Sequence, residues 1–119
     1  TSVTKNSEIW QFYLERIPTE NHIPFPALLL FPLNNTSVSL NNENQILFRW
    51  KGLDLDNDIE SYDFYIGVQD ENLNLEKEDL STSQISIQLN SNSTYFWQIR
   101  TTDKSNNSSY SKIFSFETQ

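Results

Sequence analysis

Three aspartates spaced two residues apart form the densest group of potential metal ligands in the chain. Asp54, Asp56 and Asp58 lie in one short segment, and a loop that curls on itself could turn all three toward one hard cation. Ca²⁺ takes about six to eight oxygen ligands and needs no nitrogen or sulfur, so it is the ion that fits. The EF-hand pattern is absent, because Ile59 and Tyr65 occupy the positions of its glycine and its last glutamate. The alternative is a solvated turn, in which Asp and Asn side chains hydrogen-bond their own backbone.

The acidic charge of the chain is concentrated around these three residues. The whole chain has a formal charge of −8, yet the segment from Asp54 to Asp79 contains ten acids and one base, a local charge of −9. The rest of the chain is therefore close to neutral. Because an acidic protein is repelled by phosphates, we expect no nucleic-acid partner.

The residue types that most catalysis and cofactor binding require are missing. The chain has no Cys, which removes thiol nucleophiles, disulfides and thiolate metal sites, and His22 is its only histidine. With Gly52 and Gly67 as the only glycines, no glycine-rich loop can hold a phosphate or a dinucleotide. A carboxylate pair could hydrolyse a glycoside, but it needs a cleft, for which a single small domain has little room. We expect a protein that is not an enzyme and has no cofactor other than Ca²⁺.

Two aromatic residues fall on the outward phase of alternating runs. Tyr65 and Phe96 each lie between residues of the opposite phase in segments with a period of two, so both side chains should point out of a sheet. Outward aromatic rings can stack on a sugar ring or contact a partner protein. The alternative is that a neighbouring module or a linker covers this face.

The segments that carry these residues are predicted to be short strands. Apolar and polar residues alternate in runs that are separated by clusters of Asn, Asp, Ser and Thr. The runs lie at 27–31, 38–40, 46–50, 62–66, 85–89, 95–102 and 109–118. The phase slips between Ile113 and Phe114, which indicates a bulge, and the acidic stretch 71–83 is the weakest section, with an edge strand expected near 73–75. About seven strands at this spacing predict an all-β fold, a two-sheet antiparallel β-sandwich.

The order of the runs carries a resemblance to a known family. The segments that match are, in chain order, Ile46–Trp50, the acidic loop Asp54–Asp58, Tyr62–Gly67, Leu89 with Tyr95 six residues later, Phe96–Arg100 and Ser111–Phe116. Together they resemble a fibronectin type III or related immunoglobulin-like module, of the sort found in tandem in bacterial cell-surface and secreted proteins. The resemblance spans residues 24–119 and implies a tyrosine corner at Tyr95.

Four residues are expected to form the structural core of such a sandwich. Trp50 and Trp97 fall on the inward phase of different strands, and they can fill the space between sheets about 10 Å apart. Leu89 precedes a turn and Tyr95 follows it, so the Tyr95 ring can be buried while its hydroxyl returns to a nearby backbone group. This arrangement would close the sandwich without a disulfide.

The first residues repeat a pattern from the end of the chain. Ser7–Phe12 is similar to Ser111–Phe116 at an offset of 104 residues, close to one module length. An internal repeat at this spacing predicts that residues 1–15 are the last strand of a preceding module and residues 16–23 a linker. Residues 24–119 would then be the module itself.

Two expectations depend on how the N-terminal part is interpreted. A short amphipathic helix over residues 7–17 is the alternative to the strand. As a strand in an isolated fragment, residues 7–14 would expose Trp10, Phe12 and Leu14, so a fragment dimer through residues 7–14 is expected.

The expected function follows mainly from the resemblance. It implies a non-catalytic spacer or protein-interaction module of a larger extracellular or cell-envelope protein, with a lipid anchor in the parent protein as one option. Its partners would be neighbouring modules of the same chain, other proteins or glycans. The longest apolar stretch, 23–33, is interrupted by three prolines and is too short to span a membrane. The alternatives are a carbohydrate-binding module that uses Tyr65 and Phe96, and a linker module stabilised by Ca²⁺ at Asp54, Asp56 and Asp58.

Overall fold

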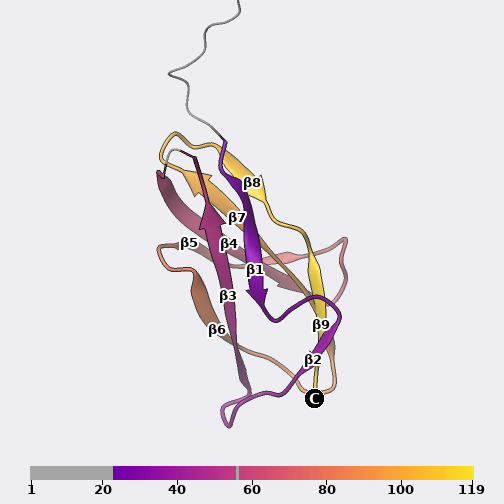
Figure 1. The fold of residues 1–119 in the computed structure, drawn as a ribbon. Helices are drawn as coiled ribbons and strands as arrows, with labels where there is room; N and C mark the ends of the chain where they lie inside the picture. The colour runs from indigo at the N-terminus through magenta and orange to yellow at the C-terminus, as the bar shows by residue number, and fades with distance from the viewer. Residues whose placement is uncertain (1–22, 56) are drawn as a thin grey trace, which may run out of the picture.

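The computed structural model describes residues 23–55 and 57–119, and within them the fold is all-β, with two facing sheets (Figure 1). The strands are β1 (Phe25–Phe31), β2 (Thr36–Val38), β3 (Gln45–Leu53), β4 (Ile59–Gly67), β5 (Asn74–Leu80), β6 (Gln84–Gln88), β7 (Thr94–Asp103), β8 (Ser108–Tyr110) and β9 (Phe114–Thr118). The predicted class, a two-sheet and mostly antiparallel β-sandwich, is confirmed. None of the described residues forms a helix that could cross a membrane.

The two sheets differ in size. One has the order β1-β3-β6, and the other has the order β2-β9-β7-β4-β5, with β8 paired to β7. All pairings are antiparallel except that of β2 with β9. In Figure 1 the strands β1 and β3 lie in front of β4 and β7, so a core forms between the two layers.

Nine strands are found where about seven were expected, because the acidic stretch contributes β5 and the predicted segment 109–118 is interrupted. After Phe31 the chain passes through a cis Phe31–Pro32 bond and moves from β1 in one sheet to β2 in the other. Proline has no N–H to donate to a ladder, which suits it to this crossing point. At the C-terminal end, Ser111 takes over the pairing between β8 and β9: its N–H donates to Ile99 O at 2.8 Å, and its Oγ accepts from Ile99 N–H at 2.9 Å. The phase slip before Phe114 is therefore a break between two strands.

Aromatic rings from both sheets meet in the core. The Phe48 ring of β3 lies 4.8 Å from that of Phe64, 5.0 Å from that of Trp97 and 5.6 Å from that of Phe116, measured between centroids and all edge-on. These four side chains are almost completely buried, and so is Trp50, which stacks on Phe64 at 6.3 Å. Edge-to-face packing at such distances is favourable beyond the area that the rings bury.

Tyr95 closes one end of the sandwich. Its ring is buried and stacks on Phe116 at 5.8 Å, and its hydroxyl accepts the N–H of Asn90 at 2.9 Å. Leu89 is half-buried against the core, and its N–H donates to Asn44 O at 2.9 Å. The loop between β6 and β7 is thus attached to the core by one phenol and to the neighbouring turn by one backbone bond.

The weak acidic stretch contains a full edge strand. β5 begins at Asn74, overlaps the expected segment 73–75 and continues to Leu80 at the end of the six-stranded sheet. The sequence predicts this strand only weakly, because Glu, Asp and Lys have low strand propensity. The predictions for residues 1–15, for the strand or helix at 7–17, for the dimer through 7–14 and for the linker up to residue 22 lie outside the described residues.

Removing only the Tyr95 hydroxyl should weaken the fold. We expect Tyr95→Phe to lower the free energy of unfolding by about 1 kcal/mol, because the Asn90 N–H loses its acceptor. Tyr110→Phe, which deletes the same atom from an exposed ring, should change it by less than about 0.5 kcal/mol. Urea unfolding followed by tryptophan fluorescence measures both. Equal effects for the two variants would show that the corner hydrogen bond contributes nothing specific.

Candidate functional site

The outer face of the six-stranded sheet presents the two aromatic residues singled out in the sequence. Along β4 and β7 alternate side chains point away from the core, and the register places Tyr65 opposite Gln98 and Gly67 opposite Phe96. Tyr65 and Phe96 are therefore diagonal neighbours on adjacent strands, and both are partly exposed. Gly67 has no side chain, and the space beside it is taken by Asn72 and Leu73 of the loop before β5.

A second tyrosine, which the sequence did not single out, joins Tyr65 from β8. The Tyr110 side chain is 52% exposed, and its ring centroid lies 5.9 Å from that of Tyr65 at an interplanar angle of 54°. The Arg100 guanidinium lies 5.7 Å from the Tyr110 ring centroid, within the range of a cation–π contact. Two phenols and one guanidinium therefore form a continuous surface, which we call the aromatic platform together with Phe96.

Polar contacts hold the aromatic platform in place. Arg100 Nη1 lies 3.8 Å from Asp63 Oδ2, and Asp63 Oδ1 accepts the Asp79 N–H of the edge strand at 3.0 Å. Asp63 is buried, so these two partners compensate for the loss of water around its charge. Gln98 Nε2 donates to Ser111 O at 2.9 Å. The side chains that surround the rings are thus oriented by the sheet itself.

The Tyr65 phenol is neutral at physiological pH. Partial burial raises the pKa of Tyr65 above its ordinary value, the Tyr110 hydroxyl and the Asp63 carboxylate raise it further, and a hydrogen bond with Arg100 opposes the rise. A neutral phenol both donates and accepts hydrogen bonds. Tyr65 can therefore bind a polar ligand as well as present a ring face.

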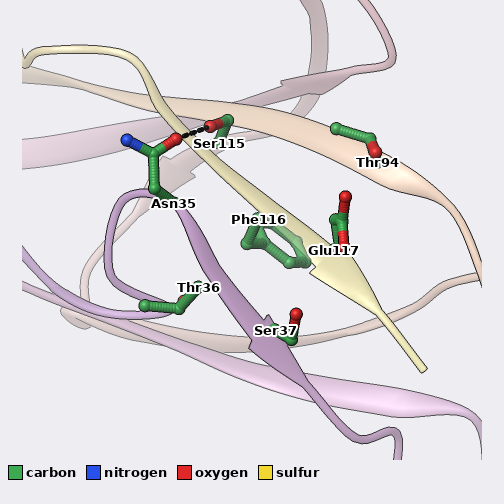
Figure 2. A pocket seen from close by; sticks show the side chains of 7 residues that line it. All are labelled: Asn35, Thr36, Ser37, Thr94, Ser115, Phe116 and Glu117. Atoms are coloured by element: carbon green, nitrogen blue, oxygen red, sulfur yellow. Dashed lines mark hydrogen bonds between the residues drawn. The ribbon is translucent and has the colours of Figure 1, made fainter.

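A polar groove lies beside the aromatic platform, along β2, β9 and the start of β7 (Figure 2). It has a volume of about 370 Å³ and continues into a hollow of about 310 Å³, with Ser37, Thr94 and Glu117 lining both. Figure 2 shows Asn35 and Ser115 joined at one end, where Ser115 Oγ donates to Asn35 Oδ1 at 3.0 Å.

The groove and the aromatic platform are directly adjacent. Ser115 of β9 is the register partner of Phe96, and Glu117 is the register partner of both Thr94 and Ser37. Hydroxyl, amide and carboxylate groups therefore begin one strand away from the aromatic rings. No alternation pattern could reveal this groove, because it depends on the parallel pairing of β2 with β9.

The acidic loop forms a turn in which two backbone N–H groups are hydrogen-bonded within the turn itself. Asp54 Oδ2 accepts the Asp58 N–H at 3.2 Å, and Asp54 O accepts the Asn57 N–H at 3.2 Å, with Asn57 at a φ of 55°. Asp58 O in turn accepts the Lys104 N–H from the next loop at 3.0 Å. Asp56 lies outside the described residues, and among those described no three Asp, Glu or His side chains gather as metal ligands do.

Comparisons with known proteins identify the fold and no family. No family model and no curated protein sequence matches the chain. Among solved structures, a fibronectin type III-like protein from Clostridium thermocellum superposes with a TM-score of 0.58 at 8% identity, over 83% of this chain and 94% of that one. The chain therefore has a fibronectin type III-like β-sandwich fold.

A second solved structure places a similar sandwich within a much longer chain. The β-1,2-glucanase from Parabacteroides distasonis superposes with a TM-score of 0.59 at 14% identity, over 86% of this chain and 14% of that one. At these identities the likeness concerns the fold alone.

Calcium should leave the stability of the chain unchanged. We expect equal melting temperatures in EDTA and in millimolar Ca²⁺, because Asp54 already uses one carboxylate oxygen to hold the turn and the described acids do not gather as metal ligands do. An ion that binds only the folded state must raise the melting temperature. A rise in Ca²⁺ that is absent in Asp54→Asn would establish the calcium site instead.

Proposed function

We propose that this chain is a non-catalytic module that spaces and connects parts of a larger protein. Its support is the fold, which resembles a fibronectin type III-like protein and, in the glucanase, a portion that amounts to 14% of a longer chain. The residue types present add to this support, since nucleophilic thiols are absent from the sequence and His22 is its only imidazole.

The parent protein would be extracellular or part of the cell envelope, either secreted or held by a lipid anchor. A domain whose loops are closed by a tyrosine hydroxyl, and not by disulfides, folds equally well in oxidising and reducing surroundings. The direct partners of the module would be its neighbours in the same chain. Residues 1–15 as the last strand of a preceding module, followed by a linker, form part of the same proposal.

A spacer module must fold without its neighbours. We expect residues 24–119 alone to unfold in one cooperative transition, at a melting temperature within about 5 °C of that of the full chain, because the core and the tyrosine corner lie entirely inside this range. Differential scanning calorimetry of the two proteins tests this. Loss of cooperative unfolding would show that the N-terminal residues are part of the folded unit, and that the division into module and linker is wrong.

A specific observation supports a second function, glycan binding. The aromatic platform and the polar groove lie side by side on one sheet face, and together they match the two chemical aspects of a pyranose. The C–H faces of the sugar ring can stack on Tyr65, Tyr110 and Phe96, while its hydroxyls need the donors and acceptors that Asn35, Ser115 and Glu117 supply. A glycan of several residues would run from β4 across β7 to β9.

Binding should depend on the rings of the aromatic platform. We expect a β-1,2-glucan oligosaccharide, chosen as the first probe because of the glucanase, to bind without being cleaved. Tyr65→Ala and Phe96→Ala should each weaken binding at least about tenfold, since one stacking contact is lost. Leu47→Ala, an exposed apolar residue on the other sheet, is the matched control and should bind as the unchanged protein does.

Titration calorimetry with a panel of oligosaccharides, followed by chromatography of the recovered glycan, gives both readouts. Absence of binding across the panel would contradict glycan binding and would leave the spacer function unaffected. Shortened glycans would contradict the non-catalytic assignment itself.

A further inference from the structure

The three-stranded sheet carries a charge opposite to that of the chain as a whole. The strands β1, β3 and β6 contain no Asp or Glu, although the chain has 16 acids and a formal charge of −8. Arg49 and Lys51 lie on the outward phase of β3 and are exposed. This face is therefore cationic in an acidic protein.

The same face is unusually apolar for a surface. On β1, Phe25, Leu28 and Leu30 are 46%, 53% and 37% exposed, and on β3, Leu47 and Leu53 are 41% and 38% exposed. The register pairs Leu28 with Lys51 and Phe25 with Leu53, so apolar and cationic side chains lie next to one another. We call these five apolar residues, together with Arg49 and Lys51, the basic face. Contiguous apolar surface of this kind marks interaction sites.

The basic face reaches the open edge of its sheet. β1 ends the order β1-β3-β6, and among the described residues no strand pairs with its other side. The opposite edge strand, β6, has polar outward residues, namely Gln84, Ser86 and Gln88. Pro26 shortens the stretch of β1 that could accept a new strand, and residues 27–31 contain no further proline. Unprotected apolar edges are where one chain receives another.

A surface with the complementary properties lies on the other sheet of the same chain. The edge strand β5 is exposed along both of its faces up to Asp79, and it has three acids, Glu76, Glu78 and Asp79, against one base. Leu75 on this strand is 48% exposed. We call Leu75 with the three acids the acidic edge.

We infer that the basic face of one copy of this chain binds the acidic edge of a second copy. Charge complementarity carries the inference: the cations of one surface meet the acids of the other, while Leu28 and Leu30 contact Leu75. The two surfaces are different, so the contact is heterologous, and each copy keeps one free surface of each kind. Association therefore continues into chains of copies. The inference does not rest on glycan binding, because the basic face belongs to the three-stranded sheet and the acidic edge is defined by Leu75, Glu76, Glu78 and Asp79, none of which is part of the aromatic platform or the polar groove.

Sedimentation velocity of the full 119-residue chain tests this contact. The weight-average sedimentation coefficient should rise with concentration at low salt, and the association constant should fall about tenfold at high salt, because exposed ion pairs are screened. A sedimentation coefficient that stays at the monomer value at every concentration would overturn the inference.

Charge reversal distinguishes this contact from others. Arg49→Glu with Lys51→Glu reverses the basic face, and Glu76→Lys with Glu78→Lys reverses the acidic edge. Each double variant alone should be monomeric, because its two surfaces then carry charge of the same sign. An equimolar mixture should associate again, because the intact basic face of one variant meets the intact acidic edge of the other and the two reversed surfaces are also complementary. Ser91→Glu, which adds an acid to the exposed loop between β6 and β7, outside both surfaces, should associate as the unchanged chain does. Circular dichroism confirms that each variant is folded.

Three results would contradict the heterologous contact. Continued association of the acidic-edge variant alone would indicate a symmetric contact between two basic faces. A mixture that stays monomeric would show that the two surfaces do not meet. Loss of association on deleting residues 1–20 would assign it to the N-terminal segment, as the expected dimer through residues 7–14 requires.

Discussion

The packing of Phe48 against Phe64, Trp97 and Phe116 is the contact on which the rest of the molecule depends. The chain is only 36% hydrophobic and has no Cys, so neither a large aliphatic core nor a disulfide can hold the two sheets together. Phe48 comes from the three-stranded sheet, and its three partners come from β4, β7 and β9 of the other. Large rings bury more surface per residue than aliphatic side chains do, which lets a few of them join two sheets. The Tyr95 hydroxyl then fixes the loop that enters β7.

A core concentrated in these rings leaves the outward residues free to differ between the two sheets. Outward positions of β4 and β7 carry Tyr65, Phe96 and Arg100, with a polar groove beside them. The outward positions of β1 and β3 in the other sheet are apolar and basic, and acids gather in the loop after β3 and on β5. Although the net charge is −8, the basic residues of β3 and the acids of β5 lie on different sheets of the sandwich. One scaffold can in this way present a surface suited to a polar ligand and a pair of surfaces suited to another copy.

Much of this arrangement could be predicted from alternation within single strands. The period of two in β3, β4 and β7 orders inward and outward residues, and it places Trp50 and Trp97 inside and Tyr65 and Phe96 outside. The alternation within one strand does not show which other strands lie beside it in the sheet. The contact of Tyr110 with Tyr65, the pairing of β2 with β9 and the link from Asp63 to Asp79 all depend on which strands are neighbours. Between β8 and β9 the Ser111 side chain accepts the Ile99 N–H in place of a backbone carbonyl, and this too leaves no periodic signal in the sequence.

Residues that hold the fold and residues that present a surface lie on opposite sides of the six-stranded sheet, and a comparison of unfolding free energies tests this division. Phe48→Ala and Phe96→Ala remove the same ring from the inner and the outer side of the sandwich. We expect urea unfolding to show a loss of about 3–5 kcal/mol for Phe48→Ala, and of no more than about 1 kcal/mol for Phe96→Ala. Equal losses would contradict it, because the outer ring would then be a structural element and not part of a binding surface.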